Sequence, residues 1–379
     1  MSRRLRVLLI LHDLAPGASS VPLHALEYLG DRIQARIVAP SSGPLRERYE
    51  HHGPVHCLRP WQPSIGSRLR RSLVLRLLRS DLLAFQPDVI YVNSVASLPA
   101  FEAIGLRGVP VLLHVHELDS HLDEYLPTRA WLGGLPDRYL AVSEAVRSAL
   151  IERGIPAERV SVIHDFVPDE YVSEERPPKG GEPGYFVVGG AGYPSWRKGL
   201  CLWLQMAAAL VSLLPEHRVE FHWVGAVENP ETRAARYRAR RLGIADRVRF
   251  IPYTASPLDH YLAFDVFAMT SWEDPCPLVV LENMALGKPV LCFRPSGGAP
   301  EEVGDAGIVI SRFCPYAMAE AAAELALIPD RRAALGRAAQ ERVKRSFVSS
   351  VQAPRVLFEL TTTAKLSSNA SARTEPLAK

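Results

Sequence analysis

The sequence predicts an α/β protein built from two parallel sheets, each in its own domain. Short runs rich in β-branched residues alternate along the chain with helical periodicity, the pattern of parallel sheets covered by helices on both faces. The 379 residues, 47% of them hydrophobic, are enough for two domains with complete cores. A polar stretch rich in Pro and Gly, residues 173–184, interrupts the alternation and predicts a linker.

The predicted strands fall into one group before the linker and one after it. Most are apolar on both faces, which indicates burial on both sides of a sheet. The first group is Leu5–Leu11, Ala35–Ala39, Asp88–Val92, Val109–Val115, Tyr139–Val142 and Val160–Ile163. The second group is Tyr185–Val188, Val219–Val224, Val248–Ile251, Val266–Met269, Val290–Phe293 and Ile308–Ile310. A helical stretch from Ala317 to about Lys344 follows the last strand.

The domain boundaries follow from these patterns. We predict an N-terminal domain over residues 1–172, the linker over 173–184 and a C-terminal domain over 185–350. A C-terminal helix over 351–366 and a small, polar, disordered tail over 367–379 complete the chain. Two similar α/β domains joined by one linker imply a cleft between them, and such folds bind ligands at the carboxyl ends of their strands.

Composition narrows the classes of function. A net charge of +3, with no clustered basic tail, gives no reason to expect nucleic acid as a partner. The five cysteines are scattered without a CxxC pair, which suits a reducing compartment without disulfides or a structural metal. The apolar run Val7–Leu11 is too short for a signal peptide, and no run approaches the roughly 20 residues of a membrane span. We therefore expect a cytoplasmic protein.

The most informative segment runs from Ser271 to Val290. Two carboxylates, Asp274 and Glu282, flank an apolar run that predicts the first turns of a buried helix. A buried carboxylate is costly unless something donates hydrogen bonds to it. Because a pair of sugar hydroxyls is one natural donor, the segment is a candidate for holding a ribose or a hexose.

A glycine-rich turn opens the second half. Gly190 and Gly192 follow a strand, and Arg197 and Lys198 precede a helix predicted from Leu200 to about Leu214. Glycines let a backbone approach a ligand closely, and a helix start favours an anion. The two cations are therefore candidates for neutralising a diphosphate without a metal ion. Since the spacing is neither GxGxxG nor a P-loop, a purely structural turn is the alternative.

A second glycine turn, at Gly297 and Gly298, leads into another helix. Its backbone N–H groups are candidates for contacts with phosphate or sugar oxygens. The alternative is a tight structural turn in which Pro300 begins the helix.

Two histidines lie at a strand end in the first half. His114 and His116 alternate along the strand, so we expect their side chains to point to opposite sides of the sheet. Histidines in or beside strands are more often structural than catalytic, and we interpret His12, His164 and His222 in that way.

These motifs resemble a known family, the family-four retaining glycosyltransferases. The stronger motifs occur in the family's order: Lys198-Gly199, Asp274-x7-Glu282, Ala285-x-Gly287-x-Pro289-Val290 and Gly297-Gly298. Weaker landmarks lie in the first half: Pro87–Ser94, His114–Glu117 and Ala141–Glu144. The resemblance implies the GT-B fold, in which two Rossmann-like domains face each other across a cleft.

The resemblance also implies roles for single residues. Glu282 is similar to the second carboxylate of the family's E-x7-E motif, which takes the ribose hydroxyls of the nucleotide. Asp274 stands where the first glutamate usually stands, near the donor sugar, and is one methylene shorter. Glu273 beside it is the alternative assignment. Lys198 and Arg197 would bind the diphosphate.

The remaining site residues come from the same resemblance. His116 occupies the position of a family histidine near the reacting sugar, so we expect it, with Asp274, to be catalytic. Further donor contacts are expected from Gly190, Gly192, Pro277, Leu278, Gly297 and Gly298. On the acceptor side only Gly17 stands where the family often has a glycine pair.

The implied activity moves a hexose-type sugar, with retention of configuration, from a nucleotide-diphosphate donor to a glycan, lipid-linked or small-molecule acceptor. No metal ion and no cofactor are expected besides the donor. Two alternatives stay open. One is a catalytically silent partner subunit, because Asp274 and the single Gly17 depart from the family pattern. The other is a sugar-nucleotide epimerase, which Lys198 and the Asp274–Glu282 spacing disfavour.

An arginine-rich helix is predicted from Ser67 to Leu83. Leu69, Leu73, Leu77 and the pair at 82 and 83 keep near-helical spacing, with arginines at 68, 71, 76 and 79 largely outside that stripe. Such a helix can lie on an anionic bilayer and reach a lipid-linked acceptor, as a peripheral contact at the inner membrane face. The alternative is an ordinary surface helix packed on the sheet.

Overall fold

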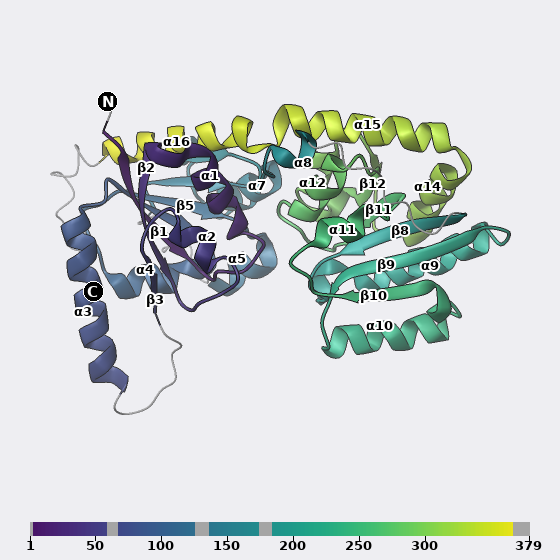
Figure 1. Ribbon diagram of the computed structural model, residues 1–379, viewed down its shortest axis with the longest axis horizontal. Coiled ribbons are helices and arrows are strands. Elements are labelled where there is room, and N and C mark those ends of the chain that lie inside the picture. Colours follow the sequence, from purple (N-terminus) through teal and green to yellow (C-terminus); the bar gives the residue numbers. More distant parts are fainter. Residues whose placement is uncertain (1–2, 59–66, 126–135, 174–183, 367–379) are drawn as a thin grey trace. The chain divides into compact units, whose positions relative to one another are not determined.

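The computed structural model describes residues 3–58, 67–125, 136–173 and 184–366. Contacts divide the chain into two compact units (Figure 1). Unit 1 comprises Met1–His164 together with Ser349–Lys379, and unit 2 comprises Asp165–Val348. Each unit contains one parallel sheet, so the predicted α/β class with two sheets is confirmed.

The sheet of unit 1 has seven strands in the order β3-β2-β1-β4-β5-β6-β7. Their bounds are β1 Leu5–Leu11, β2 Ile33–Ala39, β3 Val55–Cys57, β4 Val89–Asn93, β5 Val111–Val115, β6 Arg138–Ala141 and β7 Val160–Val162. Every predicted strand of the first half is present, and all neighbours pair in parallel. The short edge strand β3 was not predicted, because three half-buried residues carry no pattern that sets them apart from a loop.

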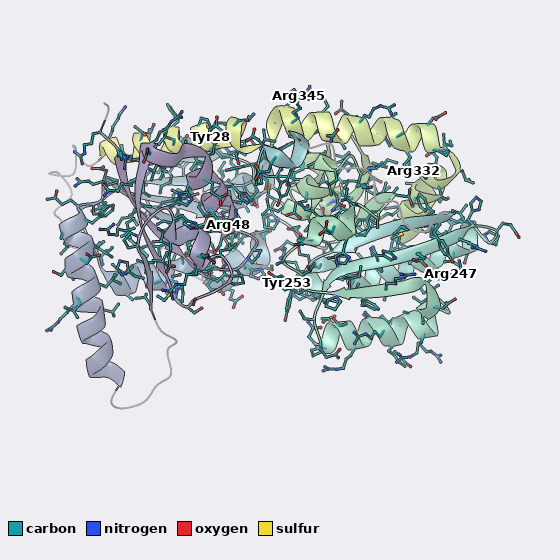
Figure 2. All side chains as sticks on the ribbon, in the orientation of Figure 1. Tyr28, Arg48, Arg247, Tyr253, Arg332 and Arg345 are labelled. Atoms are coloured by element: carbon teal, nitrogen blue, oxygen red, sulfur yellow. The ribbon has the colours of Figure 1, made fainter. Side chains whose placement is uncertain are left out.

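Seven described helices accompany this sheet. They are α1 Ser20–Leu29, α2 Arg46–Glu50, α3 Ser67–Phe85, α4 Leu98–Ile104, α5 Asp119–Tyr125, α7 Glu144–Glu152 and α16 Ser349–Ala364. Arg48 of α2 lies at the surface (Figure 2). Its guanidinium donates to both carboxylate oxygens of Glu27 of α1, at 2.8 and 2.9 Å. This bidentate geometry ties two helices that follow neighbouring strands.

The last helix, α16, packs against α1, β4 and β5, so the end of the chain belongs to the first sheet. A polar network fixes it there. Arg138 of β6 donates to Glu359 of α16 at 3.0 Å, and the hydroxyl of Ser161 of β7 donates to the same carboxylate at 2.8 Å. Glu359 is largely buried, so both partners are needed to compensate its lost hydration.

The sheet of unit 2 has six strands in the order β10-β9-β8-β11-β12-β13. Their bounds are β8 Tyr185–Ala191, β9 Arg218–Ala226, β10 Val248–Pro252, β11 Val266–Met269, β12 Val290–Phe293 and β13 Ile308–Ile310, in agreement with the six predicted strands. The described helices are α8 Glu170–Ser173, α9 Leu200–Leu213, α10 Pro230–Arg241, α11 Pro257–Tyr261, α12 Leu278–Ala285, α13 Ala299–Val303, α14 Pro315–Leu327 and α15 Pro329–Ser346. Trp203 of α9 and Trp223 of β9 pack edge to face in the core, with ring centroids 5.4 Å apart.

The helical stretch predicted from Ala317 to about Lys344 comprises two helices, α14 and α15, separated at Ile328. The stretch divides there because Pro329 begins α15 and disfavours helical geometry at the residue before it.

The boundary between the two units lies at Asp165, before the linker predicted over residues 173–184. Val167 pairs with Val348, and its N–H donates to the Phe347 carbonyl at 3.0 Å, which joins the segment after Asp165 to unit 2. Residues 174–183 of the predicted linker and the predicted tail, 367–379, lie outside the described residues. Across the described part of the chain, none of the helices is both long and apolar enough to cross a membrane.

Candidate functional site

The carboxyl ends of three neighbouring strands in unit 2, β8, β11 and β12, gather most of the predicted site residues. After β8 the chain forms a turn that ends in a 3-10 turn, Trp196–Lys198. Gly199 follows with a φ of +64°, and a Cβ there would lie 1.9 Å from the Thr270 carbonyl oxygen. Only glycine permits this approach, which brings Arg197 and Lys198 against the segment after β11.

The two glycines of this turn have different settings. Gly192 has a φ of +130°, and a Cβ would touch the Lys198 side chain at 3.1 Å. Gly190 lies inside β8, where a Cβ would come within 2.6 Å of the Trp203 ring nitrogen and 2.7 Å of Trp223. Core packing therefore explains Gly190, whereas Gly192 borders the cations.

Asp274 lies at the centre of this cluster and is only 4% exposed. The Lys198 ammonium donates to its Oδ2 at 2.6 Å, and the Arg197 guanidinium lies 3.6 Å from its Oδ1. The Ser271 hydroxyl donates to Oδ2 at 3.2 Å. Burial alone would raise the pKa of Asp274, but the Lys198 and Arg197 charges outweigh it and hold the pKa below its usual value. Asp274 is therefore ionised at neutral pH.

The second glycine turn is joined to Asp274 through the backbone. The Asp274 N–H donates to the Ser296 carbonyl at 2.7 Å, and the Gly298 N–H donates to the Asp274 carbonyl at 2.9 Å. Gly297 has a φ of +113°, which favours glycine. The structure thus brings Lys198, Asp274 and the 297–298 turn together, and one of the N–H groups expected to meet a ligand is bonded within the protein.

Glu282 lies on α12, which begins at Leu278 directly after Pro277. Its side chain is half-buried, and no hydrogen bond reaches its carboxyl from the described residues. Burial raises the pKa of Glu282 to about 8. Such a carboxyl is poised to gain hydrogen-bond partners from a ligand.

Cys276 and Glu302 belong to the same region but were not predicted. The Cys276 thiol donates to the Glu302 carboxyl at 3.1 Å, and the Asp165 N–H donates to the Cys276 sulfur at 3.3 Å. Glu302 is fully buried, and burial raises its pKa well above the usual range. The pair links the segment after β11 to α13 through a neutral carboxyl. The only sequence signal was a second acidic residue, next to Glu301, in the first turn of a short helix.

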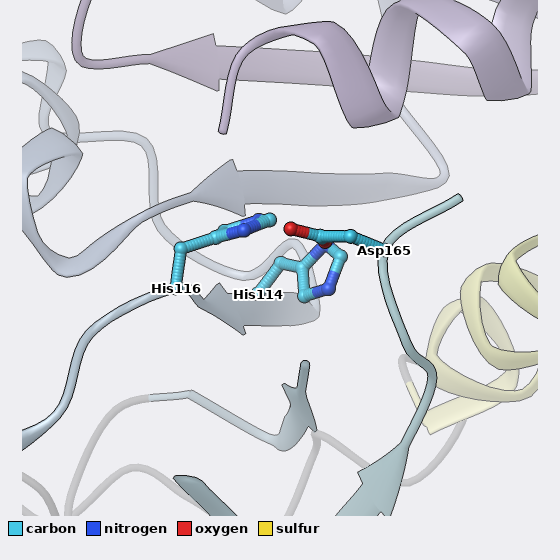
Figure 3. A group of neighbouring side chains, drawn as sticks. All are labelled: His114, His116 and Asp165. Carbon is cyan, nitrogen blue, oxygen red and sulfur yellow. The ribbon is translucent and has the colours of Figure 1, made fainter. Parts of the chain in front are cut away.

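The predicted site residues of unit 1 lie at the carboxyl ends of β1, β4 and β5. The rings of His114 and His116 lie side by side, with centroids 4.2 Å apart (Figure 3). The prediction that they point to opposite sides is wrong, because residues two positions apart along a strand lie on the same face of the sheet. His114 bonds to the Tyr91 hydroxyl at 2.7 Å within the sheet.

Asn93, at the end of β4, fixes the His116 ring. Its amide nitrogen donates to the Ala18 carbonyl at 3.0 Å, so its oxygen faces His116 Nε2, 2.9 Å away. Nε2 must therefore carry a proton. Burial lowers the pKa of His116 to about 4, so the ring is neutral at pH 7.

The turns around His116 are strained or tightly bonded. Ser94 has a φ of +79°, unusual outside glycine, and its hydroxyl donates to the Glu117 carboxylate, which also accepts the His116 N–H at 2.9 Å. In the β1–α1 turn, Gly17 has a φ of +127°, and its carbonyl accepts the Ser20 N–H at 2.8 Å. Asn93 and Glu117 lie within the weaker family landmarks but were not predicted as site residues. The fold brings Asn93 to His116, and nothing in the sequence indicated the bonds that Glu117 makes.

Two family models match the chain. One, described as glycosyl transferases group 1, matches residues 182–327, and the other, described as Glycosyltransferase Family 4, matches residues 16–171. The chain belongs to the family 4 glycosyltransferases. The predicted family is confirmed, and both halves of this glycosyltransferase match separately.

Curated relatives match in part. The glycosyltransferase is 31% identical over 153 residues to D-inositol 3-phosphate glycosyltransferase of Corynebacterium glutamicum (strain R), covering 39% of this chain and 36% of the relative. It is 36% identical over 152 residues to D-inositol 3-phosphate glycosyltransferase 2 of Catenulispora acidiphila, covering 38% and 35%. The match thus spans little more than a third of either relative.

Solved structures are similar over nearly the whole chain. Anabaena Alr3699/HepE, crystallised with UDP and glucose, has a TM-score of 0.78 at 21% identity, covering 95% of this chain and 100% of that one. Sucrose-phosphate synthase from Thermosynechococcus elongatus has a TM-score of 0.74 at 17% identity, covering 96% and 100%. This likeness establishes the fold, which is GT-B as predicted.

Proposed function

We propose that this family 4 glycosyltransferase moves a hexose-type sugar, with retention of configuration, from a nucleotide-diphosphate donor bound by unit 2. The observation that carries the proposal is the pair of cations, Arg197 and Lys198, held by Gly199 after β8, together with a carboxyl of the same unit, Glu282, that accepts no hydrogen bond from the described residues. The cations suit a diphosphate and the carboxyl suits ribose hydroxyls. The acceptor would be a glycan, a lipid-linked sugar or a small molecule.

The chemistry agrees with this assignment. In the transfer, the bond between the sugar's anomeric carbon and the diphosphate oxygen breaks while the acceptor oxygen bonds to the same carbon. Negative charge grows on the departing diphosphate, and the acceptor proton can pass to it. Fixed cations aimed at the leaving group stabilise that charge more in the transition state than in the ground state. Lys198 and Arg197 would thus take the place of a metal ion.

His116 and Asp274 are the residues we assign to the sugar. A neutral His116 with a proton on Nε2 is a hydrogen-bonding group rather than a cation, which suits recognition of a hydroxyl. The ionised Asp274 would accept hydrogen bonds from sugar hydroxyls. Pro277, Leu278 and the 297–298 turn, which border Asp274, would complete the donor contacts, and Gly17 would face the acceptor.

Relatives guide the choice of donor and acceptor to test first. One similar structure was crystallised with UDP and glucose, and partial relatives are named D-inositol 3-phosphate glycosyltransferases. UDP-glucose is therefore the first donor, and an inositol phosphate is one of the acceptors. The free cysteines among the described residues accord with a cytoplasmic setting.

A peripheral membrane contact through α3 is a further part of the proposal. Leu78 and Leu82 are buried, whereas Arg76, Leu77 and Arg79 are exposed together on the outer face. Such a mixed basic and apolar face suits an anionic bilayer that carries a lipid-linked acceptor. Of the leucine stripe predicted from the sequence, Leu82 is buried and Leu77 and Leu83 are exposed. The side chains of its other two members, at 69 and 73, lie outside the described residues.

The test measures donor turnover and binding in two variants. We expect Lys198→Ala and Glu282→Ala each to lower donor affinity or turnover at least tenfold, which is about 1.4 kcal/mol. Lys344→Ala and Glu320→Ala, which remove exposed residues of the same types elsewhere in unit 2, serve as controls. Wild-type kinetics in both site variants would contradict the assignment. Donor binding without release of nucleoside diphosphate, for any acceptor, would favour the silent partner subunit.

A further inference from the structure

The cations assigned to the donor's diphosphate already hold an anion. Lys198 contacts Asp274 at 2.6 Å, and Arg197 lies 3.6 Å from the other oxygen of the same carboxylate. Arg197 also donates to the Glu273 carbonyl at 2.8 Å. A diphosphate that enters this site therefore meets cations whose charge is partly neutralised.

Asp274 cannot easily withdraw from these cations. Its N–H and its carbonyl are both bonded to the 296–298 turn, at 2.7 and 2.9 Å, and Ser271 holds its Oδ2. Lys198 reaches the carboxylate with the end of a long, unbranched side chain and has rotamers available to turn away. The carboxylate is thus the fixed partner and the ammonium is the adjustable one.

We propose that Asp274 competes with the diphosphate for Lys198 and Arg197, and that this competition speeds release of the nucleoside diphosphate product. The inference rests on the proposed function and adds a role in the reaction cycle. It also gives a reason why position 274 carries an aspartate where the family usually has a glutamate. The aspartate forms a direct ion pair with Lys198.

The competition acts differently on substrate and product. When the sugar-bearing donor is bound, sugar hydroxyls can donate to Asp274 and compensate its loosened pair with Lys198. After transfer the sugar is gone, and the ionised carboxylate faces the diphosphate oxygens without that compensation. Like charges a few ångströms apart in a buried site repel strongly. The product is therefore destabilised relative to the donor, and Asp274 regains both cations when it leaves.

The decisive measurement is the affinity for nucleoside diphosphates by calorimetry, with UDP, GDP and ADP as the probes. We expect Asp274→Asn to bind the preferred diphosphate about tenfold more tightly than the wild type, because both cations become available. Affinity for the corresponding nucleotide sugar should gain less, because the variant also loses the carboxylate that accepts sugar hydroxyls. In turnover, inhibition by the diphosphate product should strengthen by the same factor.

Glu228→Gln is the matched control. Glu228 also lies between two arginines, 3.5 Å from Arg233 and 2.5 Å from Arg236, but at the surface, in the turn before α10. This variant should leave diphosphate affinity unchanged, so an equal gain in both variants would overturn the proposal in favour of a general charge effect.

Equal or weaker diphosphate binding by folded Asp274→Asn would also overturn it. Structural damage weakens binding, so a gain in affinity is not a consequence of a merely structural role. If Asp274→Asn does not fold, Asp274→Ser removes the same charge and is judged by the same criterion. Failure of the wild-type protein to bind any of the three diphosphates would instead defeat the proposed function, and this inference with it.

Discussion

At the scale of single residues, Glu282 makes the stability of the folded protein depend on pH and on whether a ligand is bound. Burial raises its pKa to about 8 in the folded protein, whereas an unfolded glutamate has a pKa near 4.5. Between these pH values the folded protein keeps a proton that the unfolded chain releases. The free energy of unfolding therefore falls as pH rises through this window. A ligand that hydrogen-bonds the carboxyl offsets part of that loss.

Glu282→Gln should remove this pH dependence. The amide resembles the protonated carboxyl, so both proteins should have similar stability near pH 5. At pH 9 the variant should be more stable by about 1–3 kcal/mol, because the wild type buries a charge there. Thermal unfolding at several pH values measures the difference. A difference that stays constant from pH 5 to pH 9 would show that Glu282 titrates normally.

The sequence identified the site residues that belong to a motif with a recognisable spacing. It did not identify those that reach the site only through contacts between distant parts of the chain. Lys198, Asp274 and Glu282 could be found because motif spacing places them on turns and helix starts. Glu302 and Asn93 could not, because their partners, Cys276 and His116, come from other segments of the chain and the local sequence gives no sign of these contacts. The orientation of His116 was mispredicted for a different reason, since alternation along a strand returns to the same face after two residues.

At the scale of elements, the turn between β8 and α9 depends on Gly199. Its positive φ and the close Thr270 carbonyl together hold Arg197 and Lys198 in place. The close contact between this turn and the segment after β11 therefore determines where the two cations lie.

Gly199→Ala should destabilise the protein by about 1–3 kcal/mol and weaken donor binding, because the added Cβ displaces the turn. Gly243→Ala is the matched control, since Gly243 has a φ of +71° but no atom within 4 Å of a Cβ. It should cost only the backbone strain and leave donor binding intact. Denaturant unfolding and calorimetry measure the two effects. Equal donor affinity in both variants would contradict a role for the turn.

Helix α3 carries the membrane prediction. Replacing Arg76 and Arg79 together by Ala should weaken salt-sensitive sedimentation with vesicles of anionic lipid, by about 1 kcal/mol for each arginine. Arg240 and Arg241, exposed on α10 of unit 2, provide a control pair with the same loss of charge. An equal loss of binding in the control would assign the contact to overall charge and not to α3.

The helical spacing of apolar residues predicted where helices occur. It did not predict where one helix ends and the next begins, or which sheet a helix packs against. The break between α14 and α15 is marked only by Pro329, because apolar spacing continues on both sides of it. Similarly, the pattern of α16 indicates an amphipathic helix but contains nothing that selects one sheet over another.

At the scale of the whole molecule, the placement of α16 on unit 1 depends on Glu359. Its carboxylate is 10% exposed and bonds to Arg138, which is 22% exposed. Removing one member of such a buried pair leaves the other uncompensated.

Glu359→Ala should therefore lower the free energy of unfolding by about 3 kcal/mol. Glu50→Ala, which breaks the exposed pair with Arg46 on α2, should change it far less, because solvent screens that pair. Denaturant unfolding of the full chain measures both. Comparable values for the two variants would mean that α16 is held by its apolar contacts alone.

The return of α16 to the first sheet has a consequence for biosynthesis. The ribosome releases the strands of unit 1 first, then the whole of unit 2, and the helix that packs on β4 and β5 only afterwards. Apolar surface on the nascent first sheet therefore stays uncovered while unit 2 is made and folds. Chaperones have their longest opportunity to bind there, and slow synthesis of the 165–348 segment would prolong that exposure.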